Sequence, residues 1–319
     1  MGFGAAPIGN FFVPMTDEKS ASLIKAAWEA GVRYFDTAPS YGHGLSEARC
    51  GQALRWYPRD EFVLSTKVGR LLKARKRSEI NFKPWVDGLP FEWHFDYGYD
   101  ATMRSIEDSL QRMGLERIDI ALIHEVDEYT HGSSQPEVFD VAMAGAARAL
   151  LRLREEGVVK AIGVGVNECS VAQAAIERVD FDCVLLAGRY TLLEQDALDS
   201  LLPACVQKRV SVIVGGGYNS GILATGAIST AKYNYAPATE PILERVRKIE
   251  QVCDEYDVPL KSAAMHFILA HPCIPTVIPG VRNVAQLEGN LSTFRAEIPG
   301  DFWSELRERG LIRPDAPTP

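Results

Sequence analysis

The sequence predicts an α/β fold, a single-domain (β/α)8 TIM barrel. Strand-like apolar runs alternate with helix-like segments along the 319 residues. Such alternation favours parallel pairing, because each crossover must carry the chain back across the sheet. The runs are apolar at nearly every position, which is typical of a parallel sheet buried on both faces. Eight such units favour closure into a barrel, and the chain length suits one.

The predicted elements follow one another without a long interruption until residue 67. The first helix begins at Thr16, whose hydroxyl can cap it, and ends before Gly31. The eight predicted strands cover residues 4–8, 32–35, 62–67, 118–124, 161–166, 183–187, 210–214 and 276–278. Further helices are expected over about 45–57, 100–113, 137–156, 170–178, 194–208, 259–271 and 283–293. The barrel would span residues 1–313, followed by a flexible proline-rich tail, 314–319.

Two segments are longer than a minimal barrel needs. Residues 68–99 carry many aromatic side chains, and residues 224–240 follow a glycine-rich loop. Long ordered loops in compact domains tend to be functional, so segment 68–99 is a candidate substrate wall or lid. Its aromatic side chains can equally serve to pack against the barrel rim.

Composition narrows the class of partner. The net charge is −8, with acidic and basic residues interspersed, which argues against a nucleic-acid partner. The cationic run 73–77 is interpreted as a solvated surface. Six scattered cysteines lack metal-ligand spacing, so no metal is expected. Without an apolar run of membrane-spanning length or a signal-peptide pattern, we expect a cytoplasmic protein without a membrane partner, either a monomer or a small homo-oligomer.

Three predicted strands end in ionisable side chains. Asp36 ends the second strand, Lys67 the third and His124 the fourth, while Tyr41 follows five residues after Asp36. Because active sites of such barrels lie at the carboxyl ends of the strands, these four side chains are expected to meet there.

This set suits hydride transfer at a carbonyl or an alcohol. Reduction needs a proton donor at the oxygen and oxidation needs a base there, and Tyr41 can serve as both. A free phenol has a pKa near 10, so we expect the Lys67 ammonium to lower the pKa of Tyr41. Asp36 would hold Lys67 charged and in place, and His124 would donate a hydrogen bond to the reacting oxygen.

Four motifs in the chain occur in the same order in a known enzyme family. They are GVRYFDTA (31–38) with the following Tyr41-Gly42, LSTK (64–67), DIALIH (119–124) and IPG (278–280). With these motifs the sequence resembles the aldo-keto reductase family over essentially its whole length. The resemblance implies the barrel fold and the catalytic tetrad Asp36, Tyr41, Lys67 and His124.

The resemblance also implies an extended nicotinamide dinucleotide across the barrel mouth, without a Rossmann fingerprint. Asn167 would hold the carboxamide, the loop 215–223 would wrap the pyrophosphate, and segment 280–290 would take the adenosine half. The expected cofactor-binding residues are Asn167, Gly215, Gly216, Gly217, Ser220, Gly221, Leu223, Gly280, Arg282, Gln286 and Asn290.

Some positions depart from the family pattern. Ala187 replaces a common glutamine, and Gly215 stands where many members have an aromatic that stacks on the nicotinamide. Gly280 and Gln286 replace two basic residues of members that bind a 2′-phosphate. Losing two cations favours NAD over NADP, although Arg282 remains nearby as a possible phosphate partner.

Within the family, segments 2–10, 41–47 and 188–193 resemble the L-fucose (D-threo-aldose) and L-galactose 1-dehydrogenases and pyridoxal 4-dehydrogenase. This resemblance implies NAD-dependent oxidation of a cyclic hemiacetal to a lactone. The substrate would contact residues of the long loops and of the fourth strand end, with Trp85, Trp93, Glu125 and Tyr129 as candidates.

Three alternatives stay open at this point. The substrate can be pyridoxal, which also closes into a hemiacetal and would use the same tetrad. The enzyme can instead be an NADPH-dependent carbonyl reductase. Finally, the fold also serves as a dinucleotide-binding regulatory subunit of ion channels, which would bind the cofactor tightly with negligible turnover.

Overall fold

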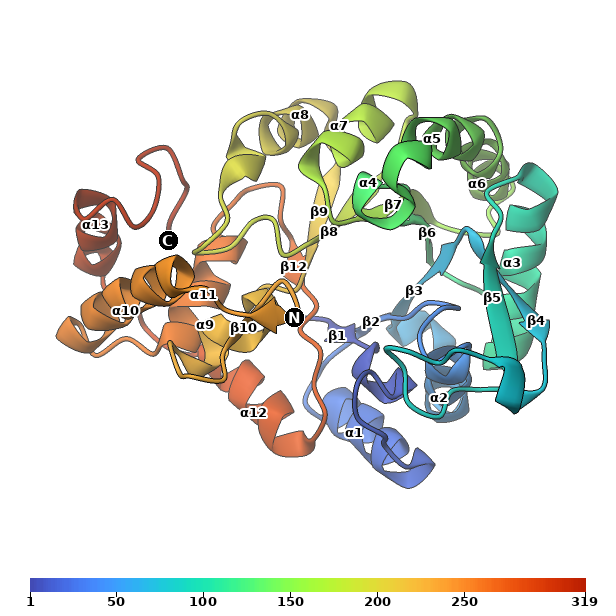
Figure 1. Cartoon of the computed structure of the whole chain (residues 1–319), viewed down its shortest axis with the longest axis horizontal. Coiled ribbons are helices and arrows are strands. Elements are labelled where there is room, and N and C mark those ends of the chain that lie inside the picture. The colour runs from blue at the N-terminus through green and yellow to red at the C-terminus, as the bar shows by residue number, and fades with distance from the viewer.

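Eight parallel strands form one sheet, in a computed structural model that describes all 319 residues (Figure 1). Their order around the sheet follows their order in the chain, so each crossover joins neighbouring strands. The strands are β1 (Phe3–Gly4), β2 (Tyr34–Asp36), β3 (Val63–Val68), β6 (Ile120–His124), β7 (Ala161–Val166), β8 (Cys183–Ala187), β9 (Ser211–Gly215) and β12 (Thr276–Val277). The predicted single-domain barrel of eight strands is confirmed.

The first and last strands close the barrel. The backbone N–H of Gly2 donates to Val277 O at 2.8 Å, and that of Gly4 donates to Pro279 O at 3.3 Å. A Cβ atom on Gly4 would lie 2.6 Å from Ile278 O, closer than real side chains approach. Glycine at position 4 therefore allows the two ends of the sheet to meet.

Helices surround the strands (Figure 1). Those of the first six units are α1 (Asp17–Glu29), α2 (Leu45–Leu54), α3 (Tyr99–Met113), α4 (Glu128–His131), α5 (Gln135–Ala144), α6 (Ala146–Glu155), α7 (Cys169–Arg178) and α8 (Leu201–Lys208). After them come α9 (Ile222–Thr225), α10 (Glu240–Glu255), α11 (Leu260–Leu269), α12 (Val284–Thr293) and α13 (Gly300–Glu308). Thr16 caps α1 as expected, since its Oγ1 accepts from Lys19 N at 3.3 Å.

Some helix predictions were wrong. The single helix expected over 137–156 is two helices, because the chain breaks at Gly145 between α5 and α6. A Cβ atom on Gly145 would lie 2.6 Å from Tyr97 O, so the break lets this backbone pack against the chain that precedes α3. The helix expected over 194–208 begins only at Leu201, and α10 and α13 were not expected at all.

The two long segments contain short antiparallel hairpins. Within 68–99, β4 (Arg70–Ala74) pairs with β5 (Phe91–Phe95), and within 224–240, β10 (Lys232–Tyr233) pairs with β11 (Ala236–Pro237). Both segments are thus ordered by backbone hydrogen bonds of their own. The first continues directly from β3, which carries Lys67 at the barrel mouth.

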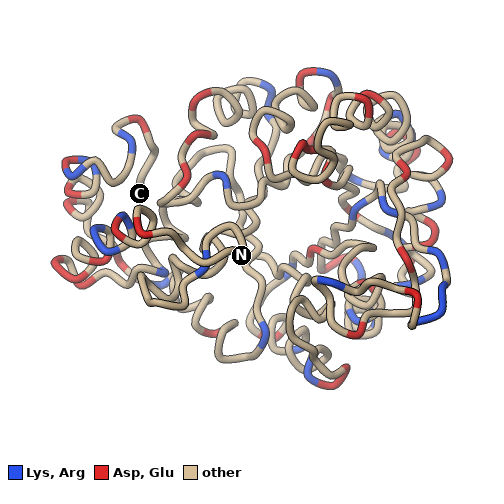
Figure 2. Tube along the Cα trace, viewed as in Figure 1, with Lys and Arg blue, Asp and Glu red and all other residues tan.

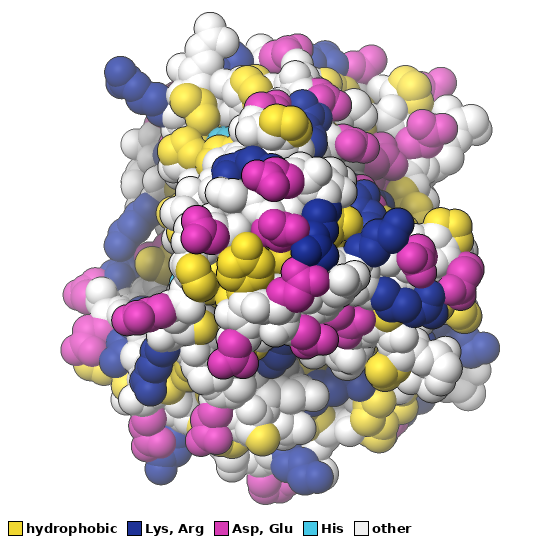
Figure 3. All heavy atoms as spheres, turned by 90° about the vertical axis from the view of Figure 1, so that its left-hand side faces the viewer, with side chains coloured by type: hydrophobic (Ala, Val, Ile, Leu, Met, Phe, Trp, Pro, Cys, Tyr) yellow, Lys and Arg dark blue, Asp and Glu magenta, His cyan; other side chains and the backbone are white.

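The surface carries mixed charge, as the sequence indicated. Acidic and basic residues are interspersed around the outer helices (Figure 2), and on the face beside α10 and α13 their side chains are mixed with small apolar areas (Figure 3). No helix has the length and apolar character that crossing a lipid bilayer requires.

The C-terminal tail, expected to be flexible, makes specific contacts. Arg307 Nη2 donates to Ala316 O at 3.1 Å and to Thr318 Oγ1 at 2.7 Å. The Ala316 side chain is buried against the apolar core. These contacts attach residues 314–319 to α13.

Candidate active site

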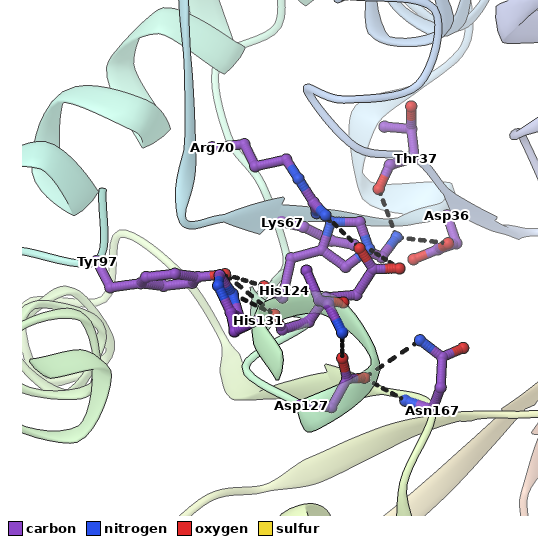
Figure 4. Close-up of polar contacts among 11 residues, drawn as sticks. Asp36, Thr37, Lys67, Arg70, Tyr97, His124, Asp127, His131 and Asn167 are labelled. Atoms are coloured by element: carbon purple, nitrogen blue, oxygen red, sulfur yellow. Dashed lines mark hydrogen bonds and ion pairs between the residues drawn. The ribbon is translucent and has the colours of Figure 1, made fainter. Parts of the chain in front are cut away.

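A buried ion pair lies at the carboxyl ends of β2 and β3. Lys67 Nζ donates to Asp36 Oδ2 at 2.8 Å and to Thr37 O at 2.7 Å (Figure 4). Ser65, the register partner of Asp36 across the two strands, donates from Oγ to Asp36 Oδ1 at 2.6 Å. Burial lowers the pKa of the Lys67 ammonium, but Asp36 and Tyr41 outweigh burial and leave the pKa above its ordinary value. Lys67 is therefore charged, as expected.

Tyr41 lies between this ion pair and the histidine. Lys67 Nζ is 4.8 Å from the centre of the Tyr41 ring, and the centre of the His124 imidazole is 5.9 Å from the same ring. Burial raises the pKa of Tyr41 to about 12, although the charge of Lys67 acts in the opposite direction. The prediction that the Tyr41 pKa is lowered is thus wrong for the protein without bound cofactor. Removing water from the phenolate destabilises it by more than the Lys67 ammonium stabilises it.

His124 ends β6 and is buried. Its Nδ1 atom lies 2.9 Å from Arg70 Nη1, while no protein group is within hydrogen-bonding distance of its Nε2 atom. Burial, followed by the charges of Arg70 and Lys67, holds the pKa of His124 well below its usual value. The imidazole is therefore neutral at neutral pH.

Arg70 is a member of the site that the sequence reasoning missed. It is buried at the start of β4, where Nη1 faces His124 and Nη2 forms an ion pair with the Glu125 carboxylate. The guanidinium also lies over the rings of Trp93 and Phe95, at 5.1 and 4.8 Å from their centres. The available signal was a single charge inside the otherwise apolar run that follows Lys67.

These groups border a cavity of about 460 Å³ at the barrel mouth. Tyr41, Lys67 and His124 line it directly, with Asp36 behind Lys67. The four side chains predicted to contact substrate, Trp85, Trp93, Glu125 and Tyr129, all line the same cavity. Further lining residues that were not expected are Phe11, Phe12, Arg70 and Tyr235.

Aromatic side chains of both long segments line this cavity, and both segments contact the N-terminal loop. The centre of the Phe11 ring lies 4.9 Å from that of Trp85 and 5.8 Å from that of Tyr235. The N-terminal loop therefore touches both long segments. Other aromatic side chains of 68–99 pack at the rim. The centre of the Phe95 ring, for example, lies 4.5 Å from that of the His131 ring. Segment 68–99 therefore supplies both a cavity wall and rim packing.

Asn167 lies between the large cavity and a smaller one of about 90 Å³. The buried Asp127 fixes it, since Oδ2 accepts from Asn167 N at 2.9 Å and from Asn167 Nδ2 at 3.2 Å. Asp127 also caps α4 by accepting from Thr130 N, and the sequence reasoning did not single it out. Ser220 and Gly216 from the glycine-rich loop line the smaller cavity together with Arg189.

The glycine-rich loop has the conformation of a tight turn. Gly216 and Gly221 have φ angles of 62° and 103°, in the left-handed region that favours glycine. Ser220 Oγ accepts from Tyr235 N at 3.0 Å, which ties the loop to segment 224–240. The N–H groups of Gly221 and Leu223 both donate to Tyr218 O, so they are used inside the loop.

Segment 280–290 lies beside this loop. Tyr218 OH donates to Asn290 Oδ1 at 3.2 Å, and Gln286 Oε1 accepts from Arg282 N at 2.8 Å. Arg282 Nη2 donates to Phe11 O at 3.0 Å. The two segments expected to hold the dinucleotide are therefore adjacent.

The residues at the smaller cavity suit an anionic group of a dinucleotide. Their side chains include one arginine, amides and hydroxyls but no carboxylate, and they are Tyr129, Asn167, Ala187, Gly188, Arg189, Gly216, Ser220, Asn234 and Tyr235. Ala187 and Gly215, the two departures from the family pattern, are register partners on β8 and β9. At these two strand ends a methyl group, from Ala187, therefore lies next to a residue without a side chain, Gly215.

Comparison with known proteins gives a consistent result. Residues 1–310 match the aldo/keto reductase family. The chain is 39% identical to a pyridoxal 4-dehydrogenase of Microbacterium luteolum, over 98% of this chain and 94% of that protein. It is also 39% identical to a D-threo-aldose 1-dehydrogenase of a Pseudomonas species, over 100% of this chain and 95% of that protein. An aldo-keto reductase structure from Bacillus halodurans superimposes with a TM-score of 0.75 at 21% identity, covering 98% and 92% of the two chains.

Proposed function

The chain belongs to the aldo/keto reductase family, whose members use nicotinamide cofactors, and we propose that it oxidises the anomeric hydroxyl of a small cyclic sugar to a lactone with NAD. As a member of this group it is an oxidoreductase that acts on CH–OH groups. One observation carries the proposal: the tetrad borders a cavity of about 460 Å³ in a chain 39% identical to a D-threo-aldose 1-dehydrogenase.

In the proposed reaction the substrate loses a proton from its anomeric hydroxyl and a hydride from the same carbon. The nicotinamide supplies the hydride acceptor. Tyr41 takes the proton, and the Lys67 ammonium, 4.8 Å from the centre of the Tyr41 ring, favours the phenolate. Asp36 fixes Lys67, and His124 donates a hydrogen bond that orients the hydroxyl oxygen. The aromatic walls from the loops exclude water from the carbon that gives up the hydride.

We propose that Asn167 and the two segments 215–223 and 280–290 hold the dinucleotide. One Nδ2 proton of Asn167 is donated to Asp127. The other Nδ2 proton and the side-chain oxygen Oδ1 remain for the nicotinamide carboxamide. The smaller cavity, with Arg189 and the hydroxyl of Ser220, suits the pyrophosphate. Gln286 and Asn290 lie on one side of this region, on α12.

Three features support NAD as the cofactor. A Cβ atom on Gly280 would lie 2.9 Å from Pro7 Cγ, so a lysine there would displace the neighbouring chain. Gln286 is uncharged, and Arg282 already donates to Phe11 O. In this segment a 2′-phosphate would therefore meet only the Arg282 guanidinium, which already has one donor bound to the Phe11 carbonyl.

Pyridoxal is the second candidate substrate. The pyridoxal 4-dehydrogenase relative matches this chain at the same 39% identity as the aldose enzyme. Pyridoxal closes into a hemiacetal with the same reacting group, so the tetrad would act on it in the same way. Selectivity between the sugar and pyridoxal would then depend only on the cavity walls, which include Trp85, Trp93 and Tyr129.

The test is an activity matrix on the purified protein. L-fucose, L-galactose, D-arabinose and pyridoxal are each assayed with NAD and with NADP, following absorbance of the reduced cofactor. We expect turnover with NAD and at least one sugar, and a lower dissociation constant for NAD than for NADP. Turnover with pyridoxal alone would select the second candidate, and tight cofactor binding without turnover would overturn both.

A further inference from the structure

Arg70 joins two groups of the cavity wall through one guanidinium. Nη1 contacts His124 Nδ1 at 2.9 Å (Figure 4), and Nη2 contacts the Glu125 carboxylate. The Arg70 side chain is 8% exposed and Glu125 is 29% exposed, so the pair lies largely out of water. None of the motifs that identify the tetrad contains Arg70.

The contact with Arg70 decides which nitrogen of His124 carries the proton. A guanidinium has only donors and keeps its proton, so Nδ1 of His124 must accept the hydrogen bond. A neutral imidazole whose Nδ1 accepts has its hydrogen on Nε2. That atom forms no hydrogen bond within the protein, and His124 lines the cavity. The Nε2–H group is therefore the donor available to a ligand.

We propose that Arg70 is a positioning residue that holds His124 as the neutral Nε2–H tautomer, with Glu125 as the counter-ion that keeps Arg70 in place. His124 thereby presents one hydrogen-bond donor, and no acceptor, to an oxygen bound in the cavity. The tautomer follows from the protein alone, while its use in catalysis rests on the proposed function.

The groups around His124 agree with a neutral ring. Arg70 faces it from β4 and Lys67 from β3, and both cations lower the pKa of His124 in addition to burial. Tyr41, after β2, is an uncharged phenol because its pKa is about 12. Glu125 is the one nearby anion, but its carboxylate is bound to Arg70, and its other oxygen lies 3.9 Å from His124 Nε2.

A fixed neutral donor separates the roles of the two polar groups at the reacting oxygen. A neutral Nε2–H can orient and polarise the oxygen, but it does not readily release a second proton. Tyr41 then remains the group that moves the proton. Without Arg70 the free imidazole would populate both tautomers and would also bind a proton more readily, so the donor would be lost or charged.

The direct test observes the ring nitrogens of His124 by ¹H–¹⁵N long-range correlation NMR. The cofactor-free protein is labelled with ¹⁵N-histidine, and the His124 signals are those lost in a His124→Asn variant. We expect a protonated Nε2 and an unprotonated Nδ1, both unchanged between pH 6 and 8.5. A protonated Nδ1, or a ring that titrates in that range, would overturn the proposal.

Variants of Arg70 test the cause. Arg70→Met removes charge and donors, and we expect mixed-tautomer signals that titrate between pH 6 and 8.5. Arg70→Lys keeps one charged donor and should restore much of the wild-type pattern. The matched control is Arg112→Met, which breaks another buried pair, that of Arg112 Nε with Glu47 Oε2 at 2.6 Å. It should leave the His124 signals unchanged, whereas identical signals in Arg70→Met and wild type would contradict the proposal.

Kinetics connect the tautomer to turnover with whichever substrate the wild type oxidises. In Arg70→Met we expect kcat to fall by about tenfold or more, and the pH profile to gain a second acidic limb, from the titrating His124, in addition to the rise with pH that Tyr41 gives the wild type. Arg70→Lys should remove most of that limb. If no substrate is oxidised but the NMR result holds, the proposed function fails and the tautomer assignment stands. Suppose instead that the NMR result holds but Arg70→Met has the same pH profile of turnover as the wild type. That outcome would refute the use of the tautomer in catalysis.

Discussion

The strand ends and the loops contribute to the cavity in different ways. Asp36, Lys67 and His124 sit on the neighbouring strands β2, β3 and β6, whose hydrogen-bonded register sets their spacing. The aromatic walls come from separate loops. The N-terminal loop pairs with segment 68–99 through a β-bridge between Phe11 and Trp85, and it meets segment 224–240 through the Phe11 and Tyr235 rings. Asp36, Lys67 and His124 thus belong to the rigid sheet and Tyr41 to the turn that follows β2, whereas the groups that meet the substrate ring belong to segments that can vary.

This difference separates chemistry from substrate choice. The sheet fixes the backbone at the strand ends, and hydrogen bonds to Asp36 and Thr37 hold the Lys67 side chain in place. Loop side chains can change without disturbing the barrel, and two relatives at equal identity act on an aldose and on pyridoxal by name. Substitutions at strand ends should therefore affect rate or folding, while substitutions in loops should affect binding.

The largest effect is expected for Tyr41→Phe. The change removes only the hydroxyl that transfers the proton and keeps the ring beside Trp85, whose centre is 5.3 Å away. We expect kcat/KM to fall by roughly 10²- to 10⁴-fold, the usual contribution of a positioned acid or base. Cofactor affinity, measured by fluorescence titration, should change little. Turnover near the wild-type level would remove Tyr41 from its proposed role.

Next in size is the stability effect of Lys67→Met. This change leaves Asp36 buried without its ammonium partner, and breaking a buried pair in this way costs about 3–5 kcal/mol. Urea denaturation followed by circular dichroism measures the loss. The double variant Lys67→Met/Asp36→Asn should recover much of the stability but none of the activity. Equal stability of the single variant and the wild type would show that the pair does not hold the strand ends.

The pH profile of oxidation should follow Tyr41. Its pKa is raised to about 12, so the base form is scarce at neutral pH and increases as pH rises. We expect kcat/KM for oxidation to increase from pH 7 to pH 9.5, by up to about tenfold per unit. Reduction, which needs the phenol, should show no such increase. An oxidation rate independent of pH would mean that bound cofactor brings the Tyr41 pKa below this range or that another group is the base.

The smallest effect is expected from the loops. Trp85→Ala removes a cavity wall, and we expect KM to rise by about tenfold, equivalent to about 1.4 kcal/mol, with a smaller change in kcat. The matched control is Trp56→Ala, whose side chain is 77% exposed and does not line the cavity. Trp56→Ala should leave KM unchanged. A fall in kcat alone for Trp85→Ala would assign this wall to the reaction rather than to binding.

The same division explains what the sequence could predict. The strands and the tetrad were predictable because the carboxyl ends of parallel strands meet on one face, so Asp36, Lys67 and His124 had to converge. Arg70 was not, because its contact with His124 depends on how the chain bends at the β3–β4 junction. There Gly69 has a φ of 103°, and a Cβ atom would lie 2.2 Å from Tyr97. Apolar periodicity carries no information on such a bend.

Charge effects were harder to predict than positions. Sequence reasoning recognised that Lys67 favours a phenolate, but the net direction of the Tyr41 pKa depends on how much water the loops exclude. Likewise, Gly145 within the expected helix 137–156 marks a break only because the chain at Tyr97 passes close by. Both errors come from contacts between distant segments.

The most direct measurement of the central claim follows the hydrogen at the anomeric carbon. A sugar that the enzyme oxidises is labelled with deuterium at C1, and the reduced cofactor and the product are examined by mass spectrometry and NMR. We predict that the deuterium appears on the nicotinamide ring, that the product is the lactone, and that Tyr41→Phe forms neither. Reduced cofactor without deuterium, or a product oxidised at another carbon, would contradict the assignment of this site to anomeric oxidation.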